Sequence, residues 1–574
     1  MGNNDILSKI LLEASSYNAI EDIERLVEVG MDLSMIPIQP LYIAMLSSSS
    51  DQVAELMHRV SPKQRQAFFD LDLWKKDRVD VNSFEFWIEV YSKVQDLDLI
   101  QEFVDTEDFL IYLKSRINIY TFDVEEPEYP DHDNYFLTDD MLLLVEYSED
   151  YKFPNELKYM IRNLYDKLGV EGAYTTLFKL INDSYSLLEE KHYQLKKARL
   201  EEYGFVDYYD ALEKLHTFAT YGQIDNYIKN KKPMTATIGV QSQNQSLHSS
   251  SLVSFRSEMD NISQELSLVK DNSRLSYLHF TFIRLINSTI ALQDALKGGR
   301  VELTRIGKET RSYLDLGLQK VKEVKQYSEN ESVFLCFDFF DLCKVGASLI
   351  MIEKNRIKKV LRKTPFEQND YESFLGAWWG SFLENSDEVI PKVKSFGAGL
   401  HAKQVNSMEA YRFWKQEVDL FVDSVPFINS FFKMISSLKE EGKLHDDFYL
   451  NYNVENIDFE AILISSFVNF SLGNFSGNDV NKMGVTISEL RAFFKLYFFK
   501  QKDEYVVLPL NSKEVLTTIN DFIHKFGFES IRNFEKYLYG VLAEHLSGYD
   551  FDSLEDEDYQ HIGGPILLNT LTKN

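Results

Sequence analysis

Apolar positions recur at helical spacing along most of the chain, and capping residues indicate where several helices begin. Ser49 with Gln52, and Ser61 with Gln64, each have the spacing of a capping box. Pro62 fits the first position of a helix, where its missing N–H costs nothing. These signals predict two short amphipathic helices in direct succession.

A third helix is expected after an aspartate-rich junction, with Asn82 and Glu85 capping its start and Trp87 on its apolar face. Short helices of this kind bury their apolar stripes by stacking on their neighbours. We therefore expect stacked helical hairpins, similar to a solenoid, in the N-terminal part. The sequence has no fixed repeat period, so a formal repeat protein is not predicted.

Residues 117–151 form an acidic stretch without a single Lys or Arg. We predict an acidic loop here, with a small β element made of short strands at Ile117–Phe122 and Met141–Tyr147. Helical spacing then resumes and continues to Tyr203. Gly204 is suited to a left-handed stop at that point, and Asp207 can cap the next helix.

Residues 234–255 are rich in Ser, Gln and Asn and poor in charge, which is typical of a polar linker or mobile loop. Helical patterns cover most of the chain beyond residue 255, and Tyr505–Leu508 is the one good strand candidate there. The expected fold class is mainly α. The predicted organisation is an N-terminal helical domain (1–233), the linker (234–255) and a C-terminal helical domain (256–574).

Composition narrows the classes of partner and compartment. A chain of 574 residues is too long for a single hydrophobic core. Its net charge of −29 would repel nucleic acid and anionic membrane surfaces, so neither is expected as a partner. The chain also lacks a sufficiently long apolar stretch without charges, so no membrane span is expected. The most apolar window, Val333–Ile352, contains three charged residues, which argues further against a span.

Only two cysteines are present, Cys336 and Cys343, and they lie in one helical pattern. The rise of a helix would separate them by about 10 Å, beyond the reach of a disulfide. Two reduced core cysteines favour a cytoplasmic protein.

The sequence contains no motif that identifies a catalytic or metal site, because no HExxH, GxSxG or CxxC occurs. Two acidic clusters are candidates for divalent-cation ligands: Asp70, Asp72 and Asp77 at the helix junction, and Asp131, His132 and Asp133 in the acidic loop. A structural interpretation is favoured for both. In it, the junction aspartates are compensated by neighbouring bases, namely Arg65, Lys75, Lys76 and Arg78, and the acidic loop is solvated.

Several segments together resemble a bacterial family known only as a domain of unknown function. They are Leu71-Asp-Leu-Trp74-Lys-Lys-Asp77, Arg199-Leu-Glu-Glu-Tyr-Gly204-Phe205-Val-Asp-Tyr208 with Ala211-Leu212, the stretch from Ile462 to Leu472, and the ending His561-Ile-Gly-Gly-Pro565-Ile-Leu-Leu568. This resemblance implies a bacterial cytoplasmic protein and no particular functional residues. Residues 49–73 alone are also similar to the helical N-terminal domain of bacterial magnesium transporters, although no transmembrane portion comes after them.

These observations favour a protein that is not an enzyme, needs no cofactor and acts by binding other proteins, as a scaffold or regulatory adaptor. Two alternatives remain open: a regulator that responds to divalent cations, and an unrecognised enzyme with an acidic pocket. The sequence does not indicate an oligomeric state.

Overall fold

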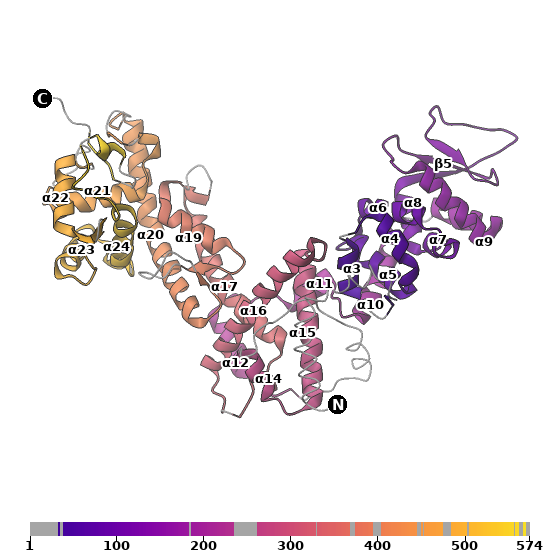
Figure 1. Cartoon of the computed structure of the whole chain (residues 1–574), viewed down its shortest axis with the longest axis horizontal. Coiled ribbons are helices and arrows are strands. Elements are labelled where there is room, and N and C mark those ends of the chain that lie inside the picture. The colour runs from indigo at the N-terminus through magenta and orange to yellow at the C-terminus, as the bar shows by residue number, and fades with distance from the viewer. Residues whose placement is uncertain are drawn as a thin grey trace. The chain divides into compact units, whose positions relative to one another are not determined.

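A computed structural model of the chain confirms the mainly α-helical fold with small β elements (Figure 1). The structure describes residues 33–34, 38–46, 48–182, 185–234, 261–328, 330–367, 373–393, 403–444, 449–451, 453–474, 484–501, 504–555, 557–561 and 566–569. Contacts group the chain into two compact units. Unit 1 comprises residues 1–216 and 227–344, and unit 2 comprises residues 217–226 and 345–574.

The division predicted from sequence, at 1–233, 234–255 and 256–574, stays a prediction. Nearly all of the predicted linker lies outside the described residues.

Unit 1 is built mainly from short helices. In chain order they are α3 (Ile38–Leu46), α4 (Ser50–Leu56), α5 (Pro62–Asp72), α6 (Val81–Lys93), α7 (Leu97–Val104), α8 (Glu107–Arg116), α9 (Pro154–Asn182), α10 (Tyr185–Glu202), α11 (Tyr208–Lys214), α14 (Asn261–Ser267), α15 (Asn272–Gln293) and α16 (Gly299–Val324). Two further helices, α12 (Tyr221–Asn230) and α17 (Phe339–Leu361), have residues in both units.

The predicted helix starts are largely confirmed. Complete capping boxes at Ser49 and Ser61 begin α4 and α5, and Pro62 occupies the first turn of α5. The predicted cap of the third helix is wrong by two residues, because Asp80 rather than Asn82 caps α6 and accepts the backbone N–H of Asn82. An aspartate or an asparagine serves equally well as a cap, so spacing alone did not separate them.

Stacked aromatic rings fill the space between these short helices. Phe84 stacks on Tyr112 at 4.4 Å between ring centroids, and Tyr91 stacks on Phe103 at 4.1 Å. All four side chains are buried. The core of this part of unit 1 is therefore a continuous aromatic cluster to which α6, α7 and α8 all contribute.

The acidic stretch carries the predicted β element, which lies beside α8 and α9 (Figure 1). Strand β5 (Leu143–Tyr147) is the centre of an antiparallel sheet, with β3 (Ile117–Thr121) on one side and β4 (Tyr135–Leu137) on the other. The strands β3 and β5 match the prediction, whereas β4 was not foreseen. A second, minimal hairpin pairs β1 (Trp74–Lys75) with β2 (Arg78–Val79) directly after α5.

Unit 2 is also mainly helical, with α21 to α24 lying together in Figure 1. Its helices are α19 (Ala377–Asp387), α20 (Met408–Glu440), α21 (Phe459–Ser471), α22 (Ile487–Tyr497), α23 (Lys513–Phe526) and α24 (Phe534–Leu546). Short antiparallel pairs join β6 (Lys392–Val393) to β7 (Lys403–Gln404) and β8 (Phe498–Gln501) to β9 (Glu504–Val507). The predicted strand near residue 505 corresponds to β9.

Both cysteines are buried and free, but the prediction that they share one helix is wrong, because Cys343 lies in α17 whereas Cys336 follows the short 3₁₀ helix Val333–Leu335. Among the helices that the structure describes, none combines the length and the hydrophobicity that a membrane span requires.

Candidate functional site

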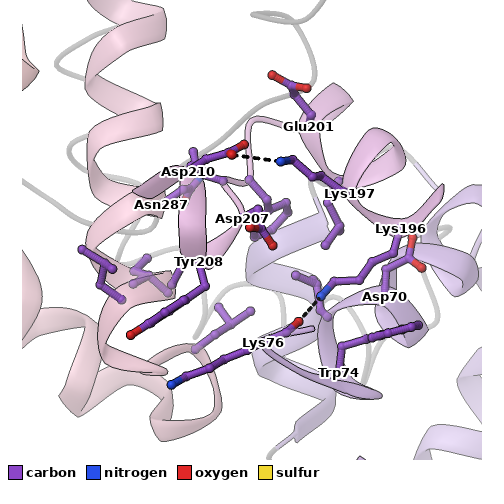
Figure 2. Close-up of a pocket in the computed structure, with 18 of the residues that line it drawn as sticks. Asp70, Trp74, Lys76, Lys196, Lys197, Glu201, Asp207, Tyr208, Asp210 and Asn287 are labelled. Atoms are coloured by element: carbon purple, nitrogen blue, oxygen red, sulfur yellow. Dashed lines mark hydrogen bonds and ion pairs between the residues drawn. The ribbon is translucent and has the colours of Figure 1, made fainter. Parts of the chain in front are cut away.

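Unit 1 contains a partly enclosed cavity of about 160 Å³, which we call the Lys196 pocket (Figure 2). Its walls come from the end of α5 and the β1–β2 hairpin, from the last two turns of α10, from the segment 205–210 at the start of α11, and from the C-terminal part of α15. Segments far apart in the sequence therefore meet here.

Local sequence shapes the first wall of the pocket. Helix α5 ends at Asp72, and the hairpin after it turns through Lys76, whose φ of 62° is left-handed. This conformation is rare for a residue with a side chain. It leaves the Lys76 carbonyl directed at the ammonium group of Lys196, 3.1 Å away (Figure 2).

The second wall is the junction between α10 and α11, and it forms as its sequence predicts. Gly204 has a φ of 81°, and the N–H of Phe205 bonds back to the carbonyl of Leu200. This is the bonding pattern of a left-handed helix stop. Asp207 then caps α11 by accepting the N–H of Tyr209.

Helix α15 closes the pocket from a distant part of the chain. It packs against α11, and its buried Asn287 donates a hydrogen bond to the Gly204 carbonyl at 2.9 Å. The same side chain accepts one from Gln39 on α3 at 3.2 Å. One amide thus ties three segments of the pocket region together.

Lys196 is the most unusual residue of the pocket, because only 8 % of it is exposed. Its ammonium lies 5.1 Å from the ring centroid of Trp74 and 5.4 Å from that of Tyr193, within range of cation–π attraction. No ion pair joins it to another residue in the described part of the chain. Burial lowers the pKa of Lys196 to about 8, although surrounding aspartates act in the opposite direction.

Four of the five acids that line the pocket, by contrast, have partners within the described residues, and the fifth, Asp294, is exposed. Asp210 pairs with Lys197 at 2.9 Å, Glu201 pairs with Arg284 at 3.2 Å, and Asp207 accepts the hydroxyl of Tyr193 at 2.7 Å. The Asp70 carboxylate receives two hydrogen bonds from the guanidinium of Arg199, at 2.6 and 2.8 Å. Burial outweighs this ion pair and raises the pKa of Asp70 to about 6.

The predicted local compensation of the junction aspartates is wrong. Asp70 pairs with Arg199, which lies more than a hundred residues away in sequence, and Arg65 instead pairs with Glu102. Asp72 does not line the pocket. It accepts hydrogen bonds from the Tyr42 hydroxyl and the Trp87 indole. Its Oδ1 atom also forms an ion pair with the ammonium of Lys297, 3.3 Å away.

The remaining metal-ligand candidates do not line this pocket. Asp77 is exposed in the β1–β2 turn, and Asp131, His132 and Asp133 are exposed in the segment before β4. His132 Nε2 lies 2.8 Å from Glu146 Oε1. Among the described residues no group of three or more His, Cys, Asp or Glu is arranged to hold a metal ion. A cation site at any of these residues stays a prediction.

Sequence reasoning missed Lys196, although a signal was present. Tyr193, Lys196 and Leu200 succeed each other at i, i+3 and i+7, and all three are on the buried face of α10. A lysine within an apolar row is unusual, because lysine is almost never fully buried without a partner.

The sequence of residues 11–499 matches the family model DUF6178, described as a family of unknown function. The chain belongs to this family. This confirms the expected membership in a family known only as a domain of unknown function, and the DUF6178 match includes every chain segment that lines the Lys196 pocket. No curated protein and no solved structure matches the chain. The likeness to magnesium transporters therefore stays a prediction.

Proposed function

We propose that this protein is a non-enzymatic binding protein, a scaffold or regulatory adaptor, and that the Lys196 pocket anchors its partner. The observation that carries the proposal is the pocket itself: a side-chain-sized cavity in which one buried lysine has no acidic partner. Burying an unpaired charge costs free energy. A site that keeps such a charge is a candidate for binding a ligand that provides the missing partner.

The size of the cavity supports anchoring of a side chain over binding of a large cofactor. Cavities of about 150 Å³ accommodate a benzene ring, and the Lys196 pocket, at about 160 Å³, is of the same size. Sites for drug-sized ligands are usually about 300 Å³ or more. Single anchors of this size dominate the energetics of many protein interfaces.

A cytoplasmic location and a protein partner remain parts of this proposal. The two buried free cysteines support a reducing compartment. The net charge of −29 supports a protein partner over a nucleic acid, whose phosphates would be repelled.

Quantitative affinity enrichment from a lysate of the encoding organism tests the proposal. Ala291→Phe on α15 would fill the pocket, because Ala291 lines it. Ala198→Phe is the matched control, since Ala198 is exposed on α10 and does not line the pocket. We expect a partner that is retained by the wild type and the control and lost by Ala291→Phe. A partner set that is identical for all three proteins would contradict a role for the pocket.

An enzyme is the second candidate, favoured by one observation. Asp70 and Lys196 line the same pocket, and their pKa values, about 6 and about 8, are both displaced toward neutrality. Such pairs are common at catalytic sites. Against this, both oxygens of Asp70 are occupied by Arg199. Trapping with benzaldehyde and cyanoborohydride tests for a reactive amine: imine formation releases water, hydride reduction fixes the adduct, and labelling confined to Lys196 would favour the enzyme.

A further inference from the structure

The buried side-chain groups of the Lys196 pocket that keep unused hydrogen-bonding capacity are donors, and the one lining carboxylate without a partner in the described structure, Asp294, is exposed. A lysine ammonium has three N–H donors, and the Lys76 carbonyl is the one acceptor that Lys196 reaches within the described residues. The indole N–H of Trp74, whose ring forms part of the wall, is also buried without a partner there. The carboxylates of Asp70, Asp207 and Asp210 already accept hydrogen bonds. A ligand that satisfies these buried donors must therefore supply acceptors.

We infer that the Lys196 pocket binds a carboxylate carried on an apolar body about the size of a benzene ring, with the carboxylate at the ammonium of Lys196. The inference rests on the proposed function, because it names the chemical group by which a partner would enter the same pocket. Two sources present this group: a free organic acid, and the C-terminal residue of a protein chain with an apolar side chain.

The charges around Lys196 are compatible with this ligand. Four aspartates face it, each from a different segment: Asp70 on α5, Asp77 in the hairpin turn, Asp108 on α8, and Asp207 before α11. None of them forms an ion pair with Lys196 in the described structure. Three are engaged elsewhere, since Asp70 binds Arg199, Asp108 accepts from Gln66, and Asp207 accepts from Tyr193.

A ligand carboxylate would thus give Lys196 the direct partner that it lacks. Charge-assisted hydrogen bonds of this kind are about twice as strong as neutral ones. A cationic ligand would be repelled by Lys196 and also by Lys76, whose ammonium lies over the Tyr208 ring at 4.5 Å at another part of the wall (Figure 2).

The rest of the wall accounts for the apolar body. Leu71, Leu200, Phe205 and Ile290 line the same cavity and come from α5, α10, the α10–α11 turn and α15. Burial of apolar surface contributes about 25 cal/mol per Å². The carboxylate supplies orientation and selectivity, while these side chains supply much of the affinity.

Titration calorimetry on the full chain at pH 7 tests the inference with three probes of equal size: benzoate, benzamide and benzylamine. We expect benzoate to bind at millimolar concentration, benzamide to bind about tenfold more weakly because it lacks the charge, and benzylamine not to bind. Benzoate affinity should fall as the pH rises through about 8, where Lys196 loses its proton. Equal binding of benzoate and benzylamine would overturn the inference.

Two substitutions locate the binding. Lys196→Met should weaken benzoate binding at least about tenfold. Lys191→Met is the matched control, because Lys191 is an exposed lysine on the same helix that does not line the pocket, and it should bind benzoate as the wild type does. If Lys196→Met does not fold, Ala291→Phe decides, since it fills the cavity and must abolish binding. Wild-type affinity in Lys196→Met or in Ala291→Phe would overturn the inference.

A pair of N-acetylated dipeptides ending in phenylalanine, one with a free carboxylate and one amidated, distinguishes the two sources. Binding of both benzoate and the free peptide supports capture of a chain terminus, and binding of benzoate alone supports a small organic acid. Failure of every carboxylate overturns the inference. It leaves the proposed function standing if Ala291→Phe still loses a partner that Ala198→Phe retains.

Discussion

Buried charges dominate the energetics at the scale of single residues, and the pair formed by Asp70 and Arg199 is the clearest case. The Asp70 side chain is fully buried, whereas 34 % of the Arg199 side chain is exposed. We expect Arg199→Met to destabilise the protein by about 1 to 2 kcal/mol at pH 8, less than the ~3 to 5 kcal/mol of fully buried pairs, because solvent screens Arg199.

The pH dependence of that loss identifies its cause. The pKa of Asp70 is about 6 in the folded protein, so at pH 5 its carboxyl is mostly neutral and needs no cation. The cost of Arg199→Met should therefore be smaller at pH 5 than at pH 8. Urea denaturation at both values measures it, and the double variant Asp70→Asn/Arg199→Met should show little difference. A penalty that is equal at the two pH values would contradict this explanation.

Asp458 in unit 2 is a buried acid whose substitution we expect to stabilise the protein, whereas Arg199→Met destabilises it. It caps α21 by accepting the N–H of Ala461 at 2.7 Å, and burial raises its pKa to about 7. The folded state thus keeps a proton that the unfolded chain releases near pH 4, so this residue's contribution to stability falls as the pH rises from about 4 to 7. Asparagine retains the cap without the charge.

We expect Asp458→Asn to raise the free energy of unfolding by about 1 kcal/mol at pH 8 and to have little effect at pH 4. Thermal melting at the two pH values tests this. Asp521→Asn, at an exposed position on α23, is the control and should change neither melt. A lower melting temperature for Asp458→Asn at pH 8 would contradict the assignment.

Residue-scale features divide sharply into those that the sequence predicts and those that it does not. The caps at Ser49, Ser61 and Asp207 were predictable, because each contacts atoms within a few residues of itself. The partner of Asp70 was not, because Arg199 comes beside it only after α10 has packed on α5. The sequence neighbours of Asp70 were equally charged candidates, and only the fold selects among them.

At the scale of elements, the contact between the start of α19 and helix α21 restricts which residue can occupy position 376. Gly376 precedes α19 with a φ of 90°, and a Cβ added there would lie 2.4 Å from the Glu460 carboxyl carbon. That carboxylate accepts the first-turn N–H of Trp378 at 2.8 Å, so α21 supplies the cap that a glycine cannot give α19.

A pair of glycine substitutions separates this contact from backbone strain. Gly442 also has a positive φ, 65°, but its Cβ would meet nothing within 4 Å. We expect Gly442→Ala to cost about 1 kcal/mol, from strain alone, and Gly376→Ala about 3 kcal/mol, from strain and overpacking together. Chemical denaturation measures both, and equal losses would show that the contact with Glu460 is unimportant.

The sequence predicts the boundaries of several helices, but it does not predict which helices pack against each other. The helical patterns at 407–440, 457–471 and 512–526 predict α20, α21 and α23 to within two residues at each end, because amphipathic spacing and caps are local signals. The strand β4 was missed, since three residues carry too little periodicity to be recognised. The Lys196 pocket could not be predicted at all, because it exists only where α5, α10, α11 and α15 converge.

At the scale of the whole molecule, the two units predict the unfolding behaviour. Each has its own buried core, with Phe84 and Tyr112 in unit 1 and Trp379 and Tyr537 in unit 2. Chains with more than one such unit commonly depart from two-state unfolding. We expect calorimetry of the full chain to resolve two transitions, with Arg199→Met lowering one and Gly376→Ala lowering the other. A single transition that both variants shift equally would contradict this.

The segments that line the pocket are translated one after another, and this order has a consequence for the nascent chain. Helices α5 and α10 emerge first, and Asn287 on α15, which bonds to Gln39 and to Gly204, is translated much later. A nascent chain that contains α5 and α10 but not α15 lacks one wall of the pocket. The proposed ligand affinity is therefore acquired only after α15 has been translated, and chains that terminate before α15 would neither bind the partner nor compete for it with the complete chain.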